Sequence, residues 1–306
     1  MQLYKFMTAN RMISLLEKLT LRFTPPLFQN DPFEYRPYIQ AELPDFDDTH
    51  MSKEFFLNDD SLVISTAQSY LIQLSQHLGV CSFSQSPNSI LMWSHYAHNH
   101  TGACVSFNSD HDFFKQEHKD YINALSAVEY SDTRPIVSLR ELRETGFLVL
   151  PPEWPEWRKF VRQRLDVLVT KSHSWEYEKE VRLLRELPNE VSALSFAYFG
   201  SSYINASSCP ENILQSQLVT VPPEAIQSVI LGARCVTHHM DGEHDSLEEK
   251  LRELLKENPK LRHVRVLLSR LDHKAYSVNV FDPHDTEAAR KYLHPQERIG
   301  RIVFGP

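Results

Sequence analysis

The segment "SHSWEYEKEVRLL", residues 172–184, places Glu176, Glu178 and Glu180 at every second position, directly before an apolar run. Side chains alternate between the two faces of a β-strand. If a strand begins near Glu176, the three carboxylates and Arg182 lie on one of its faces. The spacing therefore predicts a strand with one acidic face.

This acidic face has two interpretations. Most charged side chains face water, so a half-exposed strand with a solvated acidic face is the simpler one. The other is a carboxylate pair at the mouth of a cleft. Alternate residues of a strand lie about 6–7 Å apart, which suits gripping two parts of one ligand.

The composition is typical of a globular protein, with 306 residues, of which 42% are hydrophobic and 24% are charged. We expect a single α+β domain over residues 1–306, with a core at about 3–235 and a C-terminal extension at 236–306 that completes or decorates it. The formal charge of −8 disfavours non-specific binding to a phosphate backbone.

The sequence gives no sign of a membrane or secretory segment. No apolar run approaches the ~20 residues that cross a bilayer, and the first residues lack a signal-peptide pattern. The cysteines are widely spaced, at Cys81, Cys104, Cys209 and Cys235. We therefore expect a soluble cytoplasmic protein with reduced thiols and no membrane partner.

Hydrophobic spacing predicts a mixture of short strands and helices. Helices are expected over 10–20, 54–78, 88–102, 155–171 and 245–257, with Asn88 as a cap and Gly102 as a stop for the third. Strands are expected over 3–7, 21–24, 79–84, 103–107, 128–132, 177–184, 217–221, 226–231, 264–271 and 275–281. Strict alternation of strands and helices is absent, as is any GxGxxG or GxxxxGK[ST] loop. The pattern predicts an α+β fold without a glycine-rich phosphate loop.

The helix over 88–102 carries aromatic and histidine side chains. Met92, His95 and Tyr96 form an i, i+3, i+4 patch, for which a satisfied core face is the simpler interpretation. His95, His98 and a cysteine do not have the spacing of a standard zinc site, so we predict no bound metal.

Several motifs in order resemble the bacterial family catalogued as domain of unknown function 2971. They are "LYKF", "NDPF" at 30–33, "CSFS" at 81–84, "MWSHYA" at 92–97 and "WEYEKEVR" at 175–182. The resemblance spans about residues 3–235, with one inserted serine at Ser82. Asn30, Asp31 and Trp93 belong to these motifs, so the resemblance counts them among the ligand-binding residues.

A looser resemblance links the chain to the ADP-ribosyltransferase superfamily, in which a late "E-x-E-V" strand holds the catalytic glutamate. It implies a split, mixed or antiparallel sheet with surrounding helices, Glu180 as that glutamate and Glu178 as its partner. The serine motif then falls on Ser84, or alternatively on Ser82. The first-strand residue falls on Tyr4 or Lys5, where the superfamily uses arginine or histidine.

The second resemblance implies NAD as the substrate, bound without a Rossmann fingerprint. Glu180 would bond the nicotinamide ribose and stabilise positive charge at its anomeric carbon. The remaining roles follow from residue type: Lys5 and Arg22 against the pyrophosphate, Phe83 or Tyr96 stacked on nicotinamide, and His95 on a ribose or phosphate. Other implied partners are a protein or nucleic-acid acceptor and an antitoxin or phage-defence component.

Three alternatives stay open at this point. One is a non-catalytic nucleotide or nucleic-acid sensor on the same fold. Another is a metal-dependent nuclease or hydrolase that uses Glu178, Glu180 and Asp31 to hold a divalent ion. The third is a structural scaffold, in which changing Glu180 alters stability alone.

Overall fold

The structure is a computed structural model that describes residues 1–40, 71, 77–115, 121–144, 154–187, 217–235 and 247–292. Most of the helix predicted over 54–78 lies outside the described residues. Within it, Leu71 is helical and fully buried, and Leu78 already begins a strand. None of the described helices is long and apolar enough to span a bilayer.

The α-helices are α1 (Ala9–Lys18), α4 (Ile90–Tyr96), α5 (Asp112–Lys115), α6 (Leu139–Glu144), α7 (Trp154–Gln163), α8 (Asp166–Val169), α11 (Leu247–Glu257) and α12 (Thr286–Tyr292). The 3₁₀ helices are η1 (Pro26–Phe28), η2 (His173–Glu178), η4 (Pro223–Ala225) and η5 (Pro259–Leu261). The strands are β1 (Gln2–Met7), β2 (Thr20–Arg22), β3 (Tyr38–Gln40), β4 (Leu78–Ser84), β5 (Ala103–Asn108), β6 (Asn123–Ala127), β7 (Glu129–Tyr130), β8 (Ile136–Ser138), β9 (Thr170–Lys171), β10 (Glu180–Glu186), β11 (Leu218–Thr220), β12 (Ile226–Leu231), β13 (Arg265–Leu271) and β14 (Val278–Phe281).

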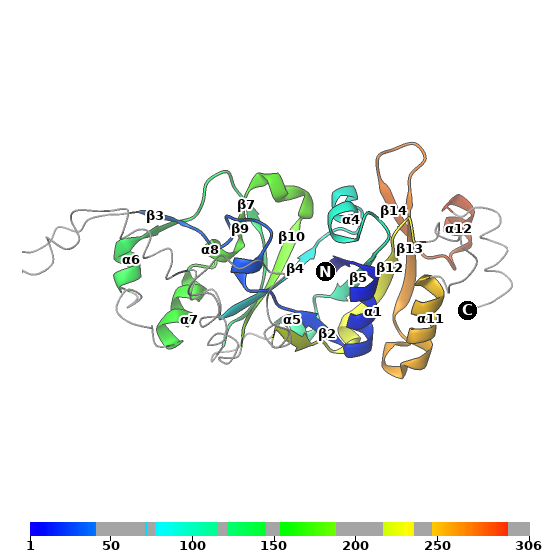
Figure 1. The fold of residues 1–306 in the computed structure, drawn as a ribbon, viewed down its shortest axis with the longest axis horizontal. Coiled ribbons are helices and arrows are strands. Elements are labelled where there is room, and N and C mark those ends of the chain that lie inside the picture. The colour runs from blue at the N-terminus through cyan, green and yellow to red at the C-terminus, as the bar shows by residue number, and fades with distance from the viewer. Residues whose placement is uncertain are drawn as a thin grey trace, which may run out of the picture.

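One eight-stranded sheet organises these elements, in the order β14-β13-β12-β5-β1-β4-β10-β6 (Figure 1). Every neighbouring pair in it is antiparallel except β12 and β13, which are parallel. The expected α+β class is therefore confirmed. Strands β13 and β14, from the C-terminal part of the chain, extend the sheet beyond β12.

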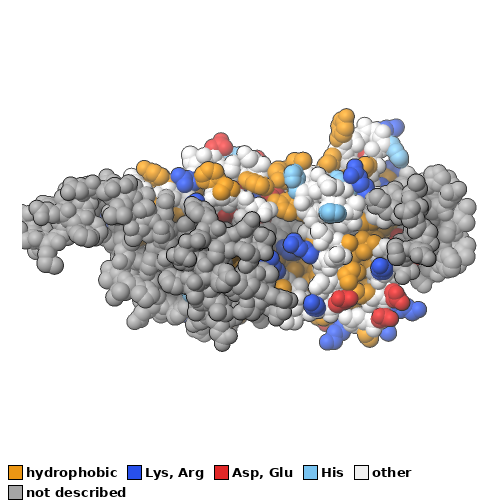
Figure 2. Space-filling model, in the orientation of Figure 1, with side chains coloured by type: hydrophobic (Ala, Val, Ile, Leu, Met, Phe, Trp, Pro, Cys, Tyr) orange, Lys and Arg blue, Asp and Glu red, His pale blue; other side chains and the backbone are white. Residues whose placement is uncertain are grey.

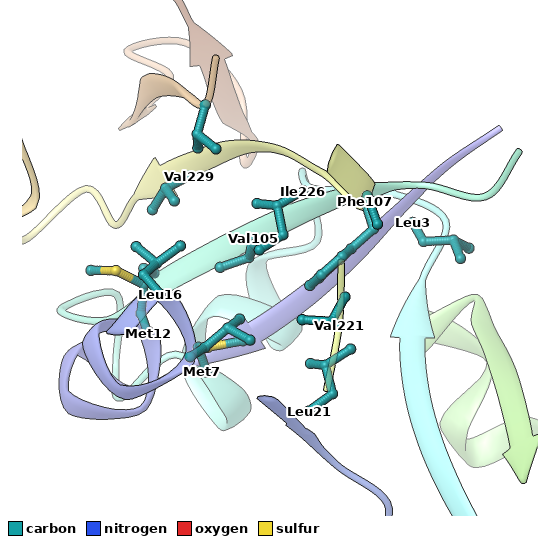
Figure 3. Packing of buried hydrophobic residues seen from close by; sticks show 14 of the residues in the cluster. Leu3, Met7, Met12, Leu16, Leu21, Val105, Phe107, Val221, Ile226 and Val229 are labelled. Carbon is teal, nitrogen blue, oxygen red and sulfur yellow. The ribbon is translucent and has the colours of Figure 1, made fainter. Parts of the chain in front are cut away.

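The sheet consists of two well-paired halves that meet at a single residue pair. Strand β1 pairs along its whole length with β5, but it pairs with β4 only at Tyr4 and Ser84. Strand β4 in turn pairs along its whole length with β10. Figure 3 shows the blue strand β1 and the cyan strand β4 running in clearly different directions. The facing edges of these two strands therefore part on leaving that pair.

The largest part of the core lies between β1, β5 and β12 and the helices α1 and α11. Helix α1 begins at a Thr8 cap and buries Met12, Leu15 and Leu16, whose i, i+3, i+4 spacing puts them on one face. Figure 3 shows Met12 and Leu16 beside the side chains of the sheet. This packing fixes α1 beside the N-terminal strand, at the rim of the opening between the two halves.

Helix α4 packs on a second core cluster, which contains Phe6 of β1. The rings of Phe6 and Trp93 meet edge to face with centroids 5.1 Å apart. The cap of α4 is Ser89, whose hydroxyl accepts from the Met92 amide, so the prediction of Asn88 is wrong.

The predicted C-terminal end of this helix is also wrong. Helix α4 stops at Tyr96 because His98, Asn99 and His100 take positive φ values of 47°, 53° and 70°. Gly102 serves a different purpose from ending a helix. A Cβ there would lie 2.3 Å from the Met7 carbonyl oxygen, so the close approach to β1 requires a glycine.

The strand predicted over 177–184 begins later than expected. Residues His173–Glu178 form the 3₁₀ helix η2, and Lys179 ends it with a positive φ of 44° before β10 starts at Glu180. The acids therefore do not share a strand face, although Glu180 and Arg182 do. The predicted helix over 155–171 is likewise divided, into α7, α8 and the short strand β9.

Candidate functional site

A cavity of about 520 Å³ lies where β1 and β4 part. That volume is in the usual range for a small-molecule site. Nine of the predicted site residues line it: Tyr4, Lys5, Arg22, Asn30, Phe83, Ser84, Tyr96, Glu178 and Glu180. These residues come from β1, β2, β4, α4, η2 and β10 and from the loop after η1, so the fold brings distant motifs to one cavity.

Three predicted residues do not line this cavity. Trp93 is fully buried in the core, where its indole N–H donates to the Pro87 carbonyl oxygen at 2.7 Å. His95 is exposed on α4, with its ring 6.0 Å from that of Tyr177. Asp31 is buried, accepts from the Phe33 amide at 2.9 Å, and lines a second cavity.

Glu178 and Glu180 lie side by side around one ammonium group. Lys171 of β9 donates to Glu178 Oε2 at 2.7 Å and to Glu180 Oε2 at 3.2 Å. Both glutamates are only 4% exposed, and all three side chains line the cavity. The two carboxylates of the sequence motif therefore lie together, and the cation that joins them, Lys171, precedes the motif.

A second cation holds Glu180 from behind the cavity wall. The Arg182 guanidinium, 2% exposed, donates to Glu180 Oε1 at 3.0 Å through Nε. It also donates through two nitrogens to Glu34, at 2.9 and 2.5 Å. Because such fork-like pairs restrict both partners, Arg182 fixes where the Glu180 carboxylate points. Glu34 comes from the loop that follows the "NDPF" motif, 148 residues away in sequence.

These contacts set the charge of the site. Burial opposes ionisation of Glu180, but attraction to Arg182 and Lys171 outweighs it and lowers the pKa of Glu180 to about 2. Burial also opposes the charge on Lys171, yet Glu180 and Glu178 raise its pKa above the usual value. At Glu34 burial prevails over Arg182, and the pKa of that carboxyl is raised. Glu180 is thus an ionised acceptor at neutral pH and is not suited to be a proton donor.

Tyrosine hydroxyls complete the acid cluster. Tyr96 of α4 donates to Glu178 Oε1 at 2.6 Å, and Asn30 bonds the same hydroxyl. Burial and that hydrogen bond to Glu178 raise the pKa of Tyr96 far above its ordinary value. The Glu180 amide donates to the Tyr130 hydroxyl at 2.8 Å, which fixes the first residue of β10.

The serine and lysine of the other wall have defined partners. Lys5 donates to the Ser82 carbonyl oxygen at 2.9 Å and lies 5.3 Å from the centre of the Phe83 ring. The hydroxyl of Ser82 hydrogen-bonds Glu180. The hydroxyl of Ser84 instead closes a turn with the backbone of Ser86 at 3.2 Å. Of the two serines considered from the sequence, Ser82 is the one that contacts the acid.

The two interpretations of the acidic segment each hold for part of it. The Glu176 side chain is 65% exposed and forms a 3.1 Å contact with His173, as expected of a solvated acid. Glu178 and Glu180, in contrast, are buried in the cavity wall. Sequence reasoning missed Lys171, Glu34 and Tyr130. Their signals were weak: Lys171 immediately precedes the quoted segment, and Glu34 immediately follows "NDPF".

A smaller cavity of about 230 Å³ lies next to the cluster, and Lys171 lines both cavities. The walls of the smaller cavity include Asp31, Glu34 and the loop 131–135. Among the described residues, no group of three or more His, Cys, Asp or Glu side chains is placed to hold a metal ion. The position between Glu178 and Glu180 is taken by the Lys171 ammonium.

Comparison with known proteins gives one match. Neither the curated proteins nor the solved structures contain a match to this chain. The segment 92–183, which runs from α4 to β10 and supplies Tyr96, Lys171, Glu178 and Glu180, matches the model of a family described as a protein of unknown function (DUF2971), and this match supports the resemblance to that family.

Proposed function

We propose that this protein is an NAD-dependent ADP-ribosyltransferase that modifies a protein or nucleic acid. The observation that carries the proposal is the position of Glu178 and Glu180, side by side in the wall of a cavity whose lining also includes several basic residues. A buried, ionised carboxylate can stabilise positive charge that develops at an adjacent carbon. The same cavity offers cations to the phosphates of a dinucleotide.

In the proposed reaction, the bond between the ribose C1′ and the nicotinamide nitrogen breaks, and nicotinamide leaves with its electron pair. Glu180 accepts a hydrogen bond from the ribose and stabilises the oxocarbenium-like centre. The acceptor nucleophile then bonds to C1′, and its proton passes to Glu178. The low pKa of Glu180 favours this division of work, because Glu180 stays charged throughout.

The shape of the sheet also supports the proposal. The superfamily resemblance implies a split sheet, and here β1 and β4 pair only at Tyr4 and Ser84. The cavity is lined at that junction by four residues of β1 and four of β4: Tyr4, Lys5, Phe6, Met7, Val80, Ser82, Phe83 and Ser84. The first-strand cation is Lys5, where the superfamily uses arginine or histidine.

The proposal is tested with NAD labelled in the nicotinamide or in the adenylate, incubated with the purified protein and a cell lysate. We expect release of nicotinamide and transfer of the adenylate label to macromolecules. Glu180→Gln should slow both by about 10²–10³-fold, the usual effect of removing one electrostatic stabiliser. Glu176→Gln is the matched control, because that acid lies in the same segment but is 65% exposed.

A non-catalytic nucleotide-binding protein is the second candidate, and one observation favours it. Lys171 and Arg182 already pair with the acids, which is also how a purely binding site could be built. This candidate predicts that NAD binds but no nicotinamide is released. If wild-type protein releases none with any acceptor, the transferase proposal fails.

The hydrolase alternative is less well supported by the geometry. A divalent ion held by Glu178 and Glu180 would have to take the position of the Lys171 ammonium, which lies within 3.2 Å of both. Asp31, the third acid of that alternative, lines the other cavity. Turnover that requires a divalent ion and stops with chelator would favour the hydrolase over the transferase.

A further inference from the structure

One side of the cavity is built by a helix that the catalytic proposal does not use. Arg11, Ser14 and Lys18 of α1 all line it. Their spacing of three and four residues places them in one stripe along the helix. Leu15, between them, belongs to the core and is 4% exposed, so the helix is anchored with this stripe facing the cavity.

The stripe is basic, and it continues onto neighbouring strands. Lys5 of β1 and Arg22 of β2 line the same cavity, as do Ser14 and Thr20. Within the described part of the chain, no carboxylate forms an ion pair with Lys5, Arg11 or Lys18. Figure 2 shows blue Lys and Arg side chains on the face that carries α1 in Figure 1.

The cavity is therefore electrostatically divided. At one wall, Glu178 and Glu180 are already neutralised by Lys171 and Arg182. At the α1 wall, two cations line the cavity, and the described residues of α1 that line it include no acid. Because exposed cations near a shared concave surface attract anions, this wall favours a ligand portion with more than one negative charge. A diphosphate offers several oxygens to long, flexible Arg and Lys side chains.

We propose that the α1 stripe is a diphosphate subsite, in which Arg11 and Lys18 bind the two phosphates of a nucleoside diphosphate moiety. The inference rests on the proposed function for the identity of the whole ligand, because it places the diphosphate of NAD against α1 and its nicotinamide ribose against Glu180. It does not depend on catalysis, since a nucleoside diphosphate alone should occupy the subsite.

The test is calorimetric titration of the full chain with ADP and, separately, with adenosine. The variant Arg11→Ala/Lys18→Ala should bind ADP at least tenfold more weakly than the wild type and should show a smaller loss of affinity on adding salt. Its affinity for adenosine should not change. The charge-preserving variant Arg11→Lys/Lys18→Arg should bind ADP within about threefold of the wild type.

The matched control is Lys250→Ala/Lys256→Ala, which removes two exposed cations from α11, away from the cavity lining. It should leave ADP affinity unchanged. The subsite is overturned if the wild type does not bind ADP, or if the α1 variant binds ADP as tightly as the control does. If ADP binding depends on α1 but NAD is never cleaved, the subsite stands and the transferase fails. If NAD is cleaved but the α1 variant binds ADP as tightly as the wild type does, the transferase proposal stands and the subsite fails.

Discussion

The hydroxyl of Tyr96 lies 2.6 Å from Oε1 of Glu178, so a helix and a 3₁₀ turn that are 82 residues apart in sequence meet at the cavity wall. The first residue comes from the "MWSHYA" motif and the second from "WEYEKEVR". Both lie in the segment that matches the family model. The first motif supplies the donor and the second supplies the acceptor of this partly buried hydrogen bond.

Tyr96→Phe should therefore destabilise the protein. The substitution removes a hydrogen bond to a charged group, which is worth about 1.5–3 kcal/mol. Urea unfolding measures the loss. Tyr177→Phe is the control, since that hydroxyl is in the same region and forms no hydrogen bond to a described residue. Equal stability losses in the two variants would contradict the assigned role of Tyr96.

Arg182→Met should be more damaging. The guanidinium joins Glu34 to Glu180, and its loss leaves two buried carboxylates with Lys171 alone. Removing one partner of a buried ion pair costs about 3–5 kcal/mol. Arg265→Met, at an exposed position of β13, should change the free energy of unfolding by no more than about 0.5 kcal/mol. Similar effects of the two substitutions in chemical denaturation would show that the Arg182 pairs carry little energy.

The stability that Glu180 provides should depend on pH in a defined direction. Its pKa is about 2 in the folded chain against an ordinary value of 4.5, so its ionised form is favoured by folding. The contribution is complete above about pH 4.5 and is lost as the pH falls through about 2. The difference in unfolding free energy between wild type and Glu180→Gln should accordingly stay constant above pH 4.5 and shrink below it. A difference that does not vary with pH would contradict the conclusion that Arg182 and Lys171 lower the pKa of Glu180.

Gly102→Ala tests the turn that brings α4 to the sheet. The added Cβ would lie 2.3 Å from the Met7 carbonyl oxygen and 2.9 Å from that of Ala97. Because the backbone at Met7 and Ala97 cannot move away without loss of packing, we expect the free energy of unfolding to fall by about 1–3 kcal/mol, which is typical of overpacking. Thermal unfolding of this variant, set against the wild type, measures the loss. An unchanged melting temperature would mean that β1 and β5 separate more easily than the packing indicates.

The sequence was sufficient to predict most strands of the sheet and the amphipathic helices α1 and α11, because these depend on local periodicity. Met12, Leu15 and Leu16 announce the buried face of α1 without any knowledge of its neighbours. The prediction failed where the backbone changes direction. The alternation of acids looked like a strand, yet Lys179 takes a left-handed conformation that nothing in the pattern requires.

The candidate site was predicted in part for a similar reason. Motif residues such as Lys5, Tyr96 and Glu180 do line one cavity. They could be predicted because a motif is recognised in the sequence without any knowledge of the three-dimensional structure. Glu34 could not be found, because its partner Arg182 is 148 residues away and only the fold joins them. Trp93 was chosen as a motif member, but its position in the sequence could not distinguish a core side chain from a cavity side chain.

The most direct test of the central claim is the crystal structure of Glu180→Gln soaked with NAD, a variant chosen because it should bind the dinucleotide and cleave it far more slowly than the wild type does. The account predicts that the nicotinamide ribose lies within hydrogen-bond distance of residue 180 and that the diphosphate lies against α1, in the cavity between β1 and β4. NAD bound elsewhere, or with its nicotinamide ribose away from residues 178 and 180, would contradict the account.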